Sequence, residues 1–370
     1  MNFKIPENYQ RILITGGAGF IGGCLVRKLL NETESQIYNL DKLTYASDLF
    51  GINSELKKLG VEALDRYNFL KVDLANKDLL SEVIKKVDPD IVFNLAAESH
   101  VDRSIDDPEI FLRSNVIGTF NLLEVLRSHY EKLSFERKSF FRLHHVSTDE
   151  VYGSAKGKIK FSEKTAYNPN SPYSATKASS DHFVRAWYSS YGLPILISNC
   201  SNNYGPWQLP EKLIPLAIYK ALNNQKIPIY GDGKNIRDWL YVDDHVEAII
   251  YCAIKGSIGS SYCIGGNNEY TNIGIVKLIC GLLNEKVSSK RNFFDLITFV
   301  ADRPGHDLRY AIDNSFILKE LGWQPKYTFE EGLNKTVDWY LANQKWCESI
   351  INKSDFISER IGLNINYKKN

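Results

Sequence analysis

The sequence Thr15-Gly16-Gly17-Ala18-Gly19-Phe20-Ile21-Gly22 is the first indication of the fold. It spaces glycines as G-x-x-G-x-x-G, directly after the apolar run 11–15 and directly before the segment 21–31, which has helical apolar spacing. Glycines allow a tight turn and a close approach of the backbone to a ligand, and a helix N-terminus offers N–H groups and positive potential to a pyrophosphate. In this strand–turn–helix context the motif predicts a dinucleotide site.

Further strand candidates follow the glycine motif along the chain. Helical segments such as 111–130 lie between apolar runs at 36–40, 68–72, 91–94, 143–147 and 194–197. This alternation predicts an α/β fold with a Rossmann-like, doubly wound parallel sheet, which binds ligands at the carboxyl ends of its strands. Asp41 ends the second strand, where a carboxylate accepts hydrogen bonds from the adenosine ribose and repels a 2′-phosphate. NAD is therefore favoured, although the neighbouring Lys42 leaves NADP open.

The sequence pattern changes after about residue 200, where predicted turns are more frequent and the predicted strands and helices are shorter. We expect an NAD-binding domain over residues 1–200 plus about 238–262. A smaller C-terminal lobe that binds a sugar nucleotide is expected over 201–237 plus 263–370. The segment 241–248 reads as an acidic helix start that returns the chain to the large lobe.

Composition excludes several functional classes. The 370 residues are 44% hydrophobic and 24% charged, and a net charge of +1 gives no reason to expect nucleic acid or an anionic membrane as partner. We find no apolar run of signal-peptide or membrane-span length. The six cysteines contain no C-x-x-C and the seven histidines show no metal-ligand spacing, so we expect reduced thiols, no metal and a cytoplasmic protein.

Tyr173 and Lys177 are the first pair of residues that predicts chemistry. Their spacing places both on one helix face, and Pro172 suits the first turn of that helix. A nearby ammonium and the positive nicotinamide ring would both lower the pKa of the tyrosine, which prepares it to act as a base at neutral pH. Thr148, at the end of the fifth strand, would hydrogen-bond the same substrate hydroxyl. This pattern predicts oxidation of an alcohol or sugar carbon.

The adjacent acids Asp149 and Glu150 indicate a second reaction. Once a sugar C4 hydroxyl becomes a ketone, the hydrogen on C5 is acidic. A carboxylate can then remove it while a carboxylic acid protonates the C6 hydroxyl as it leaves. This requires two carboxyl groups whose pKa values differ, and we expect Glu150 to be the base and Asp149 the acid. Consecutive strand residues face opposite sides, so the chain must leave extended geometry after Thr148.

Signature stretches at 95–104, 147–153, 199–206, 210–215, 237–242 and 302–307 extend this pattern through the chain. On these residues the chain resembles the extended short-chain dehydrogenase/reductase family, and within it the nucleotide-sugar epimerases and dehydratases, from Thr15 to about Trp339. Departures are few: Gly23-Cys24 replaces a Ser-Ala-like pair, and Trp207 stands where a smaller aromatic is usual.

The resemblance implies intramolecular dehydration of dTDP-glucose to dTDP-4-keto-6-deoxyglucose with tightly bound, recycled NAD+, in deoxysugar biosynthesis such as that of rhamnose. It implies catalytic roles for Thr148, Asp149, Glu150, Tyr173 and Lys177. The implied cofactor contacts are Gly16, Gly19, Phe20, Ile21, Gly22, Asp41, Lys42, Thr44, Asp73, Leu74, Leu95, Ala96, Ala97, Ser99, Ser114, Tyr173, Lys177 and Asn203. The implied substrate contacts are Ser99, Thr148, Asn202, Lys212, Leu213, Pro228, Tyr230, Arg237, Asn272, Asp302, Arg303 and His306. The resemblance also implies a homodimer that pairs helices at about 108–130 and 172–191.

Other functions remain open at this point. A nucleotide-sugar 4-epimerase shares the glycine motif and the Tyr173–Lys177 pair but has no need of the two acids. A UDP-glucuronate decarboxylase would need a cationic pocket for the sugar carboxylate and typically lacks Asp149. A dehydratase acting on a UDP- or GDP-sugar fits the same residues, and an NAD-binding scaffold would have no use for the catalytic set.

Overall fold

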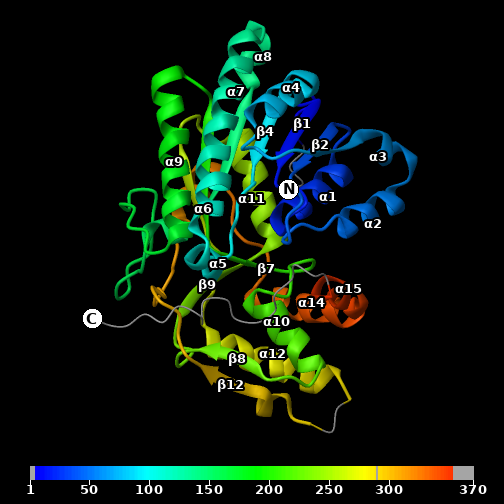
Figure 1. Ribbon diagram of the computed structural model, residues 1–370, viewed down its shortest axis with the longest axis vertical. Coiled ribbons are helices and arrows are strands. Elements are labelled where there is room, and N and C mark those ends of the chain that lie inside the picture. The colour runs from blue at the N-terminus through cyan, green and yellow to red at the C-terminus, as the bar shows by residue number, and fades with distance from the viewer. Residues whose placement is uncertain (1–4, 289–290, 353–370) are drawn as a thin grey trace.

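The computed structural model describes residues 5–288 and 291–352 (Figure 1). The parts of the two expected lobes that fall on residues 1–4, 289–290 and 353–370 lie outside this description. Among the described helices, none combines the length and apolar character needed to cross a bilayer.

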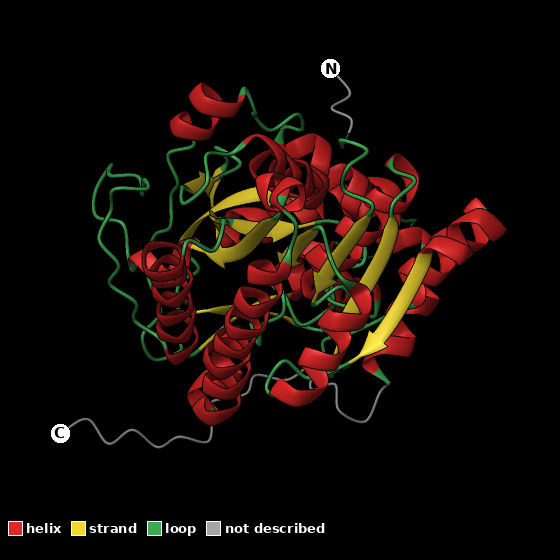
Figure 2. Cartoon of the chain, turned by 90° about the horizontal axis from the view of Figure 1, so that it is seen from above, coloured by secondary structure: helices red, strands yellow, loops and turns green. Residues whose placement is uncertain are grey.

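A seven-stranded parallel sheet forms the centre of the larger lobe, with helices on both faces (Figure 2). The strand order is β10-β6-β5-β4-β1-β2-β3, which confirms the predicted doubly wound fold. The third strand begins one residue earlier than predicted, and the sixth runs on to Cys200. The strands are β1 Arg11–Thr15, β2 Gln36–Asp41, β3 Tyr67–Lys71, β4 Ile91–Asn94, β5 Arg142–Thr148, β6 Ile195–Cys200 and β10 Ser261–Ile264.

Apolar side chains of β1 cover both faces of the sheet. Ile12 and Ile14 belong to one buried cluster with α1 (Phe20–Glu32) and α11 (Val242–Lys255). Leu13, between them, packs on the opposite face with α4 (Lys77–Val87), α7 (Gly118–Lys132) and α9 (Pro172–Tyr191). Side chains alternate along a strand, so a continuous apolar run is what a sheet covered on both faces requires. The other helices of this lobe are α2 Phe50–Leu59, α3 Val61–Arg66, α5 Val101–Asp106, α6 Pro108–Phe111, the π-helical turn η1 Leu112–Ile117, α8 Phe135–Phe140, the 3-10 turn η2 Asp149–Tyr152 and α13 Ser315–Leu321.

The strand order reverses beside β1, which lies between β2 and β4. Thr15 at the end of β1 pairs with Asn94 at the end of β4. From these neighbouring ends the chain departs to opposite faces, which opens a crevice at the carboxyl edge of the sheet. The glycine turn that follows Thr15 therefore lies at the switch point where such sheets bind ligands.

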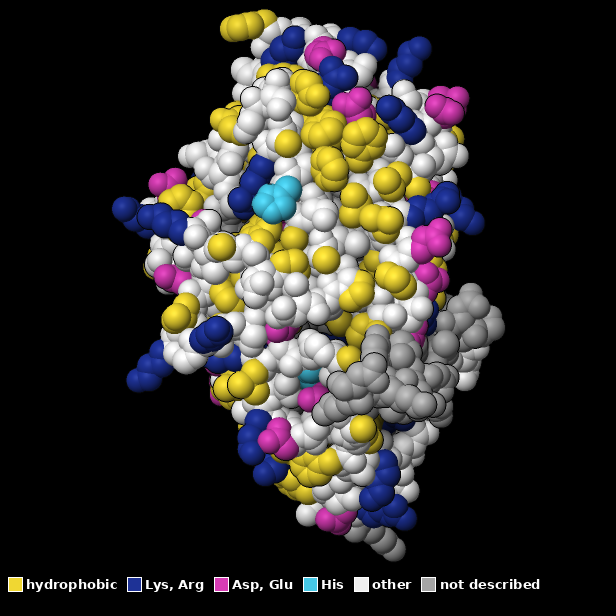
Figure 3. All heavy atoms as spheres, turned by 60° about the vertical axis from the view of Figure 1, so that its left-hand side comes forward, with side chains coloured by type: hydrophobic (Ala, Val, Ile, Leu, Met, Phe, Trp, Pro, Cys, Tyr) yellow, Lys and Arg dark blue, Asp and Glu magenta, His cyan; other side chains and the backbone are white. Residues whose placement is uncertain are grey.

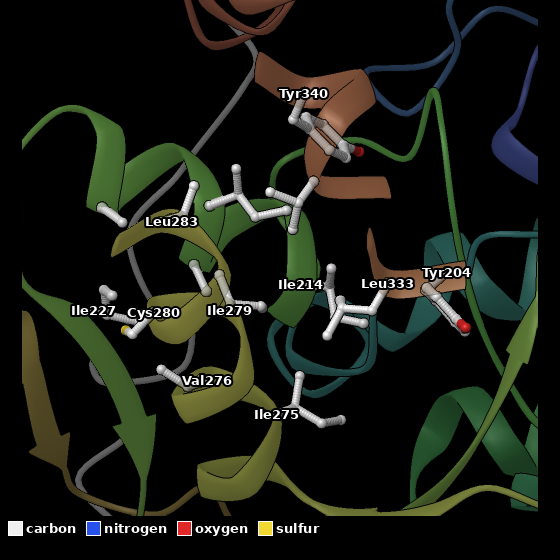
Figure 4. Packing of buried hydrophobic residues seen from close by; sticks show 14 of the residues in the cluster. Tyr204, Ile214, Ile227, Ile275, Val276, Ile279, Cys280, Leu283, Leu333 and Tyr340 are labelled. Carbon is white, nitrogen blue, oxygen red and sulfur yellow. The ribbon is translucent and has the colours of Figure 1, made fainter. Parts of the chain in front are cut away.

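The smaller lobe has a core of its own, shown in Figure 4. Ile275, Ile279 and Leu283 share one face of its helix α12 and pack in the same buried cluster as Ile214 and Leu333. The elements of this lobe are β7 Asn202–Tyr204, α10 Leu213–Leu222, β8 Ile227–Tyr230, β9 Ile236–Tyr241, β11 Glu269–Thr271, α12 Asn272–Lys286, η3 Phe293–Leu296, β12 Ile297–Val300, α14 Phe329–Ala342 and α15 Gln344–Ile351.

The division between the lobes differs from the expected boundaries in two places. β10 pairs with β6 up to Ile264, so the central sheet continues past residue 262. Helix α13 also joins the large lobe, because Ile317 and Leu321 pack in one cluster with Tyr262 of β10 and Cys252 of α11. These are apolar contacts of short elements, which turn density along the sequence does not reveal. Strand β9 ends at Tyr241 and α11 begins at Val242, within the segment 241–248 that was predicted as a helix start.

Candidate active site

A long cleft runs along the carboxyl edge of the central sheet. Its wall contains every residue that the sequence assigns to the cofactor: Gly16, Gly19, Phe20, Ile21, Gly22, Asp41, Lys42, Thr44, Asp73, Leu74, Leu95, Ala96, Ala97, Ser99, Ser114, Tyr173, Lys177 and Asn203. Thr148, Asp149 and Glu150 line the same cleft. The structure therefore gathers the predicted cofactor and catalytic residues in one continuous space.

The glycine turn is shaped to admit a pyrophosphate. Gly16 has φ +71°, and a Cβ there would lie 2.6 Å from the Ala96 nitrogen. A Cβ on Gly22 would collide with the Gly16 carbonyl, so the turn and α1 can approach each other only without side chains. Among the described residues, no side chain caps the first N–H groups of α1. Free N–H groups and the positive end of the helix thus face the place where a dinucleotide phosphate would bind.

Gly16→Ala is expected to destabilise the protein by about 2 kcal/mol or more, because it adds both a positive-φ strain and a backbone clash. It should also abolish retention of the dinucleotide. Gly281→Ala is the matched control, because a Cβ in that position of α12 meets open space, and Ala in a helix stabilises relative to Gly. Urea unfolding measures the free energy of unfolding of each variant. Equal stabilities of the Gly16 and Gly281 variants would contradict the role of Gly16.

Asp41 supplies a negative charge at the adenosine end of the cleft, beside Lys42. The Asp41 carboxylate accepts hydrogen bonds from the Ala18 N–H at 3.1 Å and the Ser47 hydroxyl at 3.0 Å, which ties the glycine turn to the loop after β2. Lys42 Nζ lies 3.0 Å from Glu98 Oε1 and donates to Ser114 Oγ at 2.6 Å. Because Glu98 balances the charge of Lys42, the arrangement fits NAD better than NADP. Glu98 was given no role in the sequence analysis.

Helix α9 presents Tyr173 and Lys177 to the cleft. It begins with a capping box, in which Ser171 and Ser174 satisfy each other's N–H groups, and with Pro172 in its first turn. Lys177 is buried, and its Nζ donates to the Val146 carbonyl of β5 at 2.9 Å. Lys177 is thereby fixed against the sheet one helical turn from Tyr173, as the sequence predicts.

The expected lowering of the Tyr173 pKa depends in part on a bound nicotinamide ring, and the protein surroundings alone act in the other direction. Burial, followed by the Glu150 carboxylate, raises the pKa of Tyr173 well above its usual value, while a hydrogen bond with Thr148 opposes this. The protein surroundings alone therefore keep the phenol protonated, and a cationic ring against it would act in the other direction.

The turn η2 resolves the geometric difficulty at Asp149 and Glu150. The Thr148 hydroxyl accepts a hydrogen bond from the Glu150 N–H at 3.3 Å and so caps the turn. At its end Gly153 has φ +76°, and a Cβ there would collide with the Asn168 carbonyl. The chain thus leaves extended geometry directly after Thr148, as required, and both carboxyl groups line the cleft.

The two acids have different electrostatic surroundings. Burial raises the pKa of Asp149 well above its usual value, and Glu150 and Asp238 raise it further. Burial also raises the pKa of Glu150, but the cations Arg303, Arg237 and Lys212 oppose it. Both pKa values are therefore raised, but three cations oppose the rise at Glu150, so the charged form is better supported at Glu150 than at Asp149. This is the division that an acid and a base in one site require.

Asp149→Asn is expected to stabilise the protein at pH 8 more than it does at pH 4. Because the folded-state pKa of Asp149 lies above the unfolded value of 3.8, the stability it contributes is present at low pH and lost as the pH rises through the folded pKa. Asparagine cannot ionise and escapes this loss. Urea unfolding of both proteins between pH 4 and pH 8 should show a gap that widens with pH; a constant gap would contradict the raised pKa.

The residues expected to contact the substrate fall into two groups. Ser99, Thr148, Asn202 and Lys212 line the cleft. The others lie outside the cleft wall, on β8, β9, the starts of α10 and α12 and the segment after β12: Leu213, Pro228, Tyr230, Arg237, Asn272, Asp302, Arg303 and His306. Arg237 and Arg303 nevertheless act on Glu150 electrostatically.

Asp102 links the second group to the large lobe. Its carboxylate accepts hydrogen bonds from the Tyr230 hydroxyl at 2.9 Å and from Arg303 at 3.0 Å. Arg237 is buried, donates to the Asp307 carbonyl at 2.9 Å and lies 4.2 Å from the centre of the Tyr310 ring. Asp102 belongs to a quoted signature stretch, but nothing in the sequence tells which side chains it would meet.

A buried network around Asp181 also escaped the sequence analysis. Its carboxylate accepts hydrogen bonds from Ser147 at 2.8 Å and Tyr167 at 2.7 Å, and lies 3.3 Å from His145 Nε2. These contacts fasten α9 to β5 at the level of the catalytic residues. An available signal was the position of Asp181 four residues after Lys177, on the same helix face.

Several buried polar atoms of the cleft wall make no hydrogen bond to the described residues and could bond a ligand. Asp149 Oδ2, Ser201 Oγ, Asn202 Oδ1 and Gln208 Oε1 are buried and have no hydrogen-bond partner among the described residues. Buried polar atoms are rarely left unpaired in native proteins, and they mark functional sites when they are. In the same residues, His, Cys, Asp and Glu side chains form no group of three or more suited to a metal ion.

Comparison with known proteins places this site in a family. The model of the GDP-mannose 4,6 dehydratase family matches residues 13–336. The chain belongs to this family. It is 50% identical over 350 residues to a dTDP-glucose 4,6-dehydratase of Shigella flexneri, covering 92% of this chain and 95% of the relative.

Solved structures of the family superpose over nearly the whole chain. A dTDP-glucose 4,6-dehydratase from Bacillus anthracis, solved in complex with NAD, is 44% identical with a TM-score of 0.80. Another from Streptomyces venezuelae, with NAD and TYD bound, is 40% identical with a TM-score of 0.82. Each match covers 92% of this chain and 99% of the solved one. Within the GDP-mannose 4,6 dehydratase family, the chain is thus similar to enzymes whose names specify one substrate.

Proposed function

We propose that the protein is a dTDP-glucose 4,6-dehydratase, a hydro-lyase that forms dTDP-4-keto-6-deoxyglucose and water. The observation that carries this function is the turn η2, which holds Asp149 and Glu150 in the same cleft as Tyr173 and the glycine turn. A 4-epimerase needs the tyrosine but not the acids. Relatives at 50% identity with this name support the choice of substrate.

The cofactor is NAD+, held by the glycine turn and Asp41 at one end and by the neighbourhood of Tyr173 and Lys177 at the other. Bound in this cleft, NAD+ supplies a reversible hydride acceptor, so that the hydrogen removed from C4 can be returned to C6. Tyr173 takes the proton of the C4 hydroxyl while Thr148 hydrogen-bonds the same oxygen. Lys177 holds a positive charge beside this site, which favours the phenolate form of Tyr173.

The elimination step is carried out by the two acids. Glu150, supported in its charged form by Arg303, Arg237 and Lys212, removes the proton from C5 of the 4-keto sugar. Asp149, kept protonated by burial, donates its proton to the C6 hydroxyl, which leaves as water. A double bond forms between C5 and C6. Glu150 is placed to return a proton to C5, and a bound cofactor would supply the hydride for C6, so that one water is lost overall.

We assign the nucleotide diphosphate to the boundary between the lobes. Lys212 and Asn202 line the cleft there, and Arg237 offers a planar pair of donors suited to phosphate oxygens. Leu213, Pro228, Tyr230, Asn272, Asp302, Arg303 and His306 would surround the nucleotide from the smaller lobe. The large lobe then holds NAD+ and the smaller lobe the sugar nucleotide.

The function is tested by incubating the purified protein, without added cofactor, with dTDP-glucose and UDP-glucose in competition. Mass spectrometry of the products should show loss of one water from the dTDP sugar alone. Water loss from UDP-glucose would assign another nucleotide. An unchanged mass, with galactose released on hydrolysis, would identify an epimerase instead.

We further propose a homodimer that forms through α9 and the segment from α6 to α7. Leu112, Ile117, Tyr188 and Tyr191 are exposed on these neighbouring elements, and Figure 3 turns this side toward the viewer. Leu112→Arg combined with Tyr191→Arg should yield monomers in sedimentation equilibrium; a monomeric wild-type protein would contradict the dimer.

We also propose a cytoplasmic location, which the six buried, unpaired cysteines support.

A further inference from the structure

The loop over residues 42–49 connects β2 to α2 and forms part of the cleft wall. Lys42, Thr44, Ala46 and Ser47 line the cleft on the side where the adenosine of a dinucleotide is expected. Asp48 follows, and its N–H donates to the Ala18 carbonyl of the glycine turn at 2.8 Å. The loop and the glycine turn are therefore bonded to each other, and movement of the loop would open the cofactor site.

The small lobe holds this loop from outside the cleft. Trp346 of α15 is 5% exposed, and its indole Nε1 donates a hydrogen bond of 2.9 Å to Asp48 Oδ2. Ala46 packs against the small-lobe core that contains Trp346. In Figure 1, α14 and α15 lie just below the large lobe, where this contact is made. A residue near the end of the described chain thus anchors a loop of the NAD-binding lobe.

The orientation of Trp346 is fixed by two other tryptophans. Its ring lies 5.2 Å from that of Trp207 and 5.2 Å from that of Trp339, in edge-to-face arrangements. Trp207 adopts φ +70°, a conformation that bulky residues rarely accept, and Arg27 of α1 lies over its ring. Indole has a single donor, so this cage decides where the Trp346 N–H points.

We propose that Trp346 is a positioning residue for the cofactor: by hydrogen-bonding Asp48 it locks loop 42–49 and slows release of bound NAD+. The inference rests on the proposed function for the identity of the dinucleotide. A hydrogen bond to a carboxylate is stronger than one between neutral groups, and it joins two lobes that would have to separate for the loop to open. This contact accounts for retention of the cofactor between turnovers.

The test is an exchange experiment on the holoenzyme. Protein loaded with radiolabelled NAD+ is mixed with excess unlabelled NAD+, and label remaining on the protein is followed with time. Trp346→Phe keeps an aromatic ring but removes the donor, and should release NAD+ about tenfold faster or more. Asp48→Ala should have a similar effect, and the double variant should be no faster than either single one. The turnover number at saturating NAD+ should stay within about twofold of wild type.

Two further variants separate the hydrogen bond from general packing. Asp48→Asn retains an oxygen acceptor but lacks the charge, and should release NAD+ more slowly than Asp48→Ala and faster than wild type. Trp323→Phe is the matched control, since Trp323 is equally buried but packs in the cluster around β10 and α13, away from the cleft. Its release rate should equal that of wild type.

The proposal is overturned if Trp346→Phe releases NAD+ at the wild-type rate, if Trp323→Phe is equally fast, or if the Trp346 and Asp48 effects add in the double variant. A wild-type protein that binds no NAD+ would overturn both this proposal and the proposed function. If the variants release NAD+ at the predicted rates but the protein does not dehydrate dTDP-glucose, the role of the Trp346–Asp48 hydrogen bond is supported and only the proposed function is contradicted.

Discussion

Glu150→Gln should stop water loss while leaving the first oxidation intact. Without a base at C5, the 4-keto sugar is formed but cannot eliminate, so NADH absorbance should accumulate after substrate is added. General base catalysis contributes roughly 10²- to 10⁴-fold to rates, and dehydration should fall by about that factor. Stopped-flow absorbance and mass spectrometry of the quenched sugar measure the two steps. Dehydration at the wild-type rate would show that Glu150 is not the base.

Asp149→Asn provides the comparison that separates base from acid. Both variants should block elimination after C4 oxidation. In deuterated water, however, the variant at Asp149 still contains Glu150 and should exchange the C5 hydrogen with solvent. The Glu150 variant should not exchange it. If the exchange pattern were reversed, the roles of the two carboxyl groups would have to be exchanged as well.

Tyr173→Phe should suppress the reaction one step earlier. Removing the phenol removes the group that takes the C4 hydroxyl proton, so NADH should not form and kcat/KM should fall by about 10²- to 10⁴-fold. Retention of NAD+ should be unchanged, because phenylalanine keeps the aromatic ring that packs beside Phe111. Single-turnover absorbance measures the oxidation directly.

Tyr188→Phe is the control for this variant. It removes a hydroxyl from the same helix, but Tyr188 is 39% exposed and does not line the cleft. Its activity should stay within about twofold of wild type. Combining Tyr173→Phe with Glu150→Gln should abolish the NADH signal that the Glu150 variant shows alone. NADH formation in the double variant would contradict the order of the two steps.

The fold could be predicted because its main signals are local. The glycine turn needs a positive φ at Gly16 and space at Gly22, and both glycines lie within one short segment of the sequence. The apolar run of β1 predicts a strand buried on both faces, as Ile12, Leu13 and Ile14 show. The path of α13 onto the large lobe was missed, since it depends on contacts between segments far apart in the sequence.

The site was predicted less completely for the same reason. Tyr173 and Lys177 share a helix face, and Asp149 follows the end of a strand, so local geometry places them. The pairing of Lys42 with Glu98, the carboxylate of Asp102 between Tyr230 and Arg303, and the Trp346–Asp48 bond all join distant elements. Burial and the Glu150 carboxylate raise the pKa of Tyr173, and these effects also depend on elements that lie far apart in the sequence.

The most direct test of the account follows one hydrogen through the reaction. dTDP-glucose deuterated at C4 is converted by the wild-type protein in ordinary water, and the product is examined by NMR and mass spectrometry. Deuterium should leave C4 and appear on C6 of a 4-keto-6-deoxy product, with a solvent proton at C5. Deuterium that stays on C4 of an epimerised sugar, or that is lost from the sugar altogether, would contradict it.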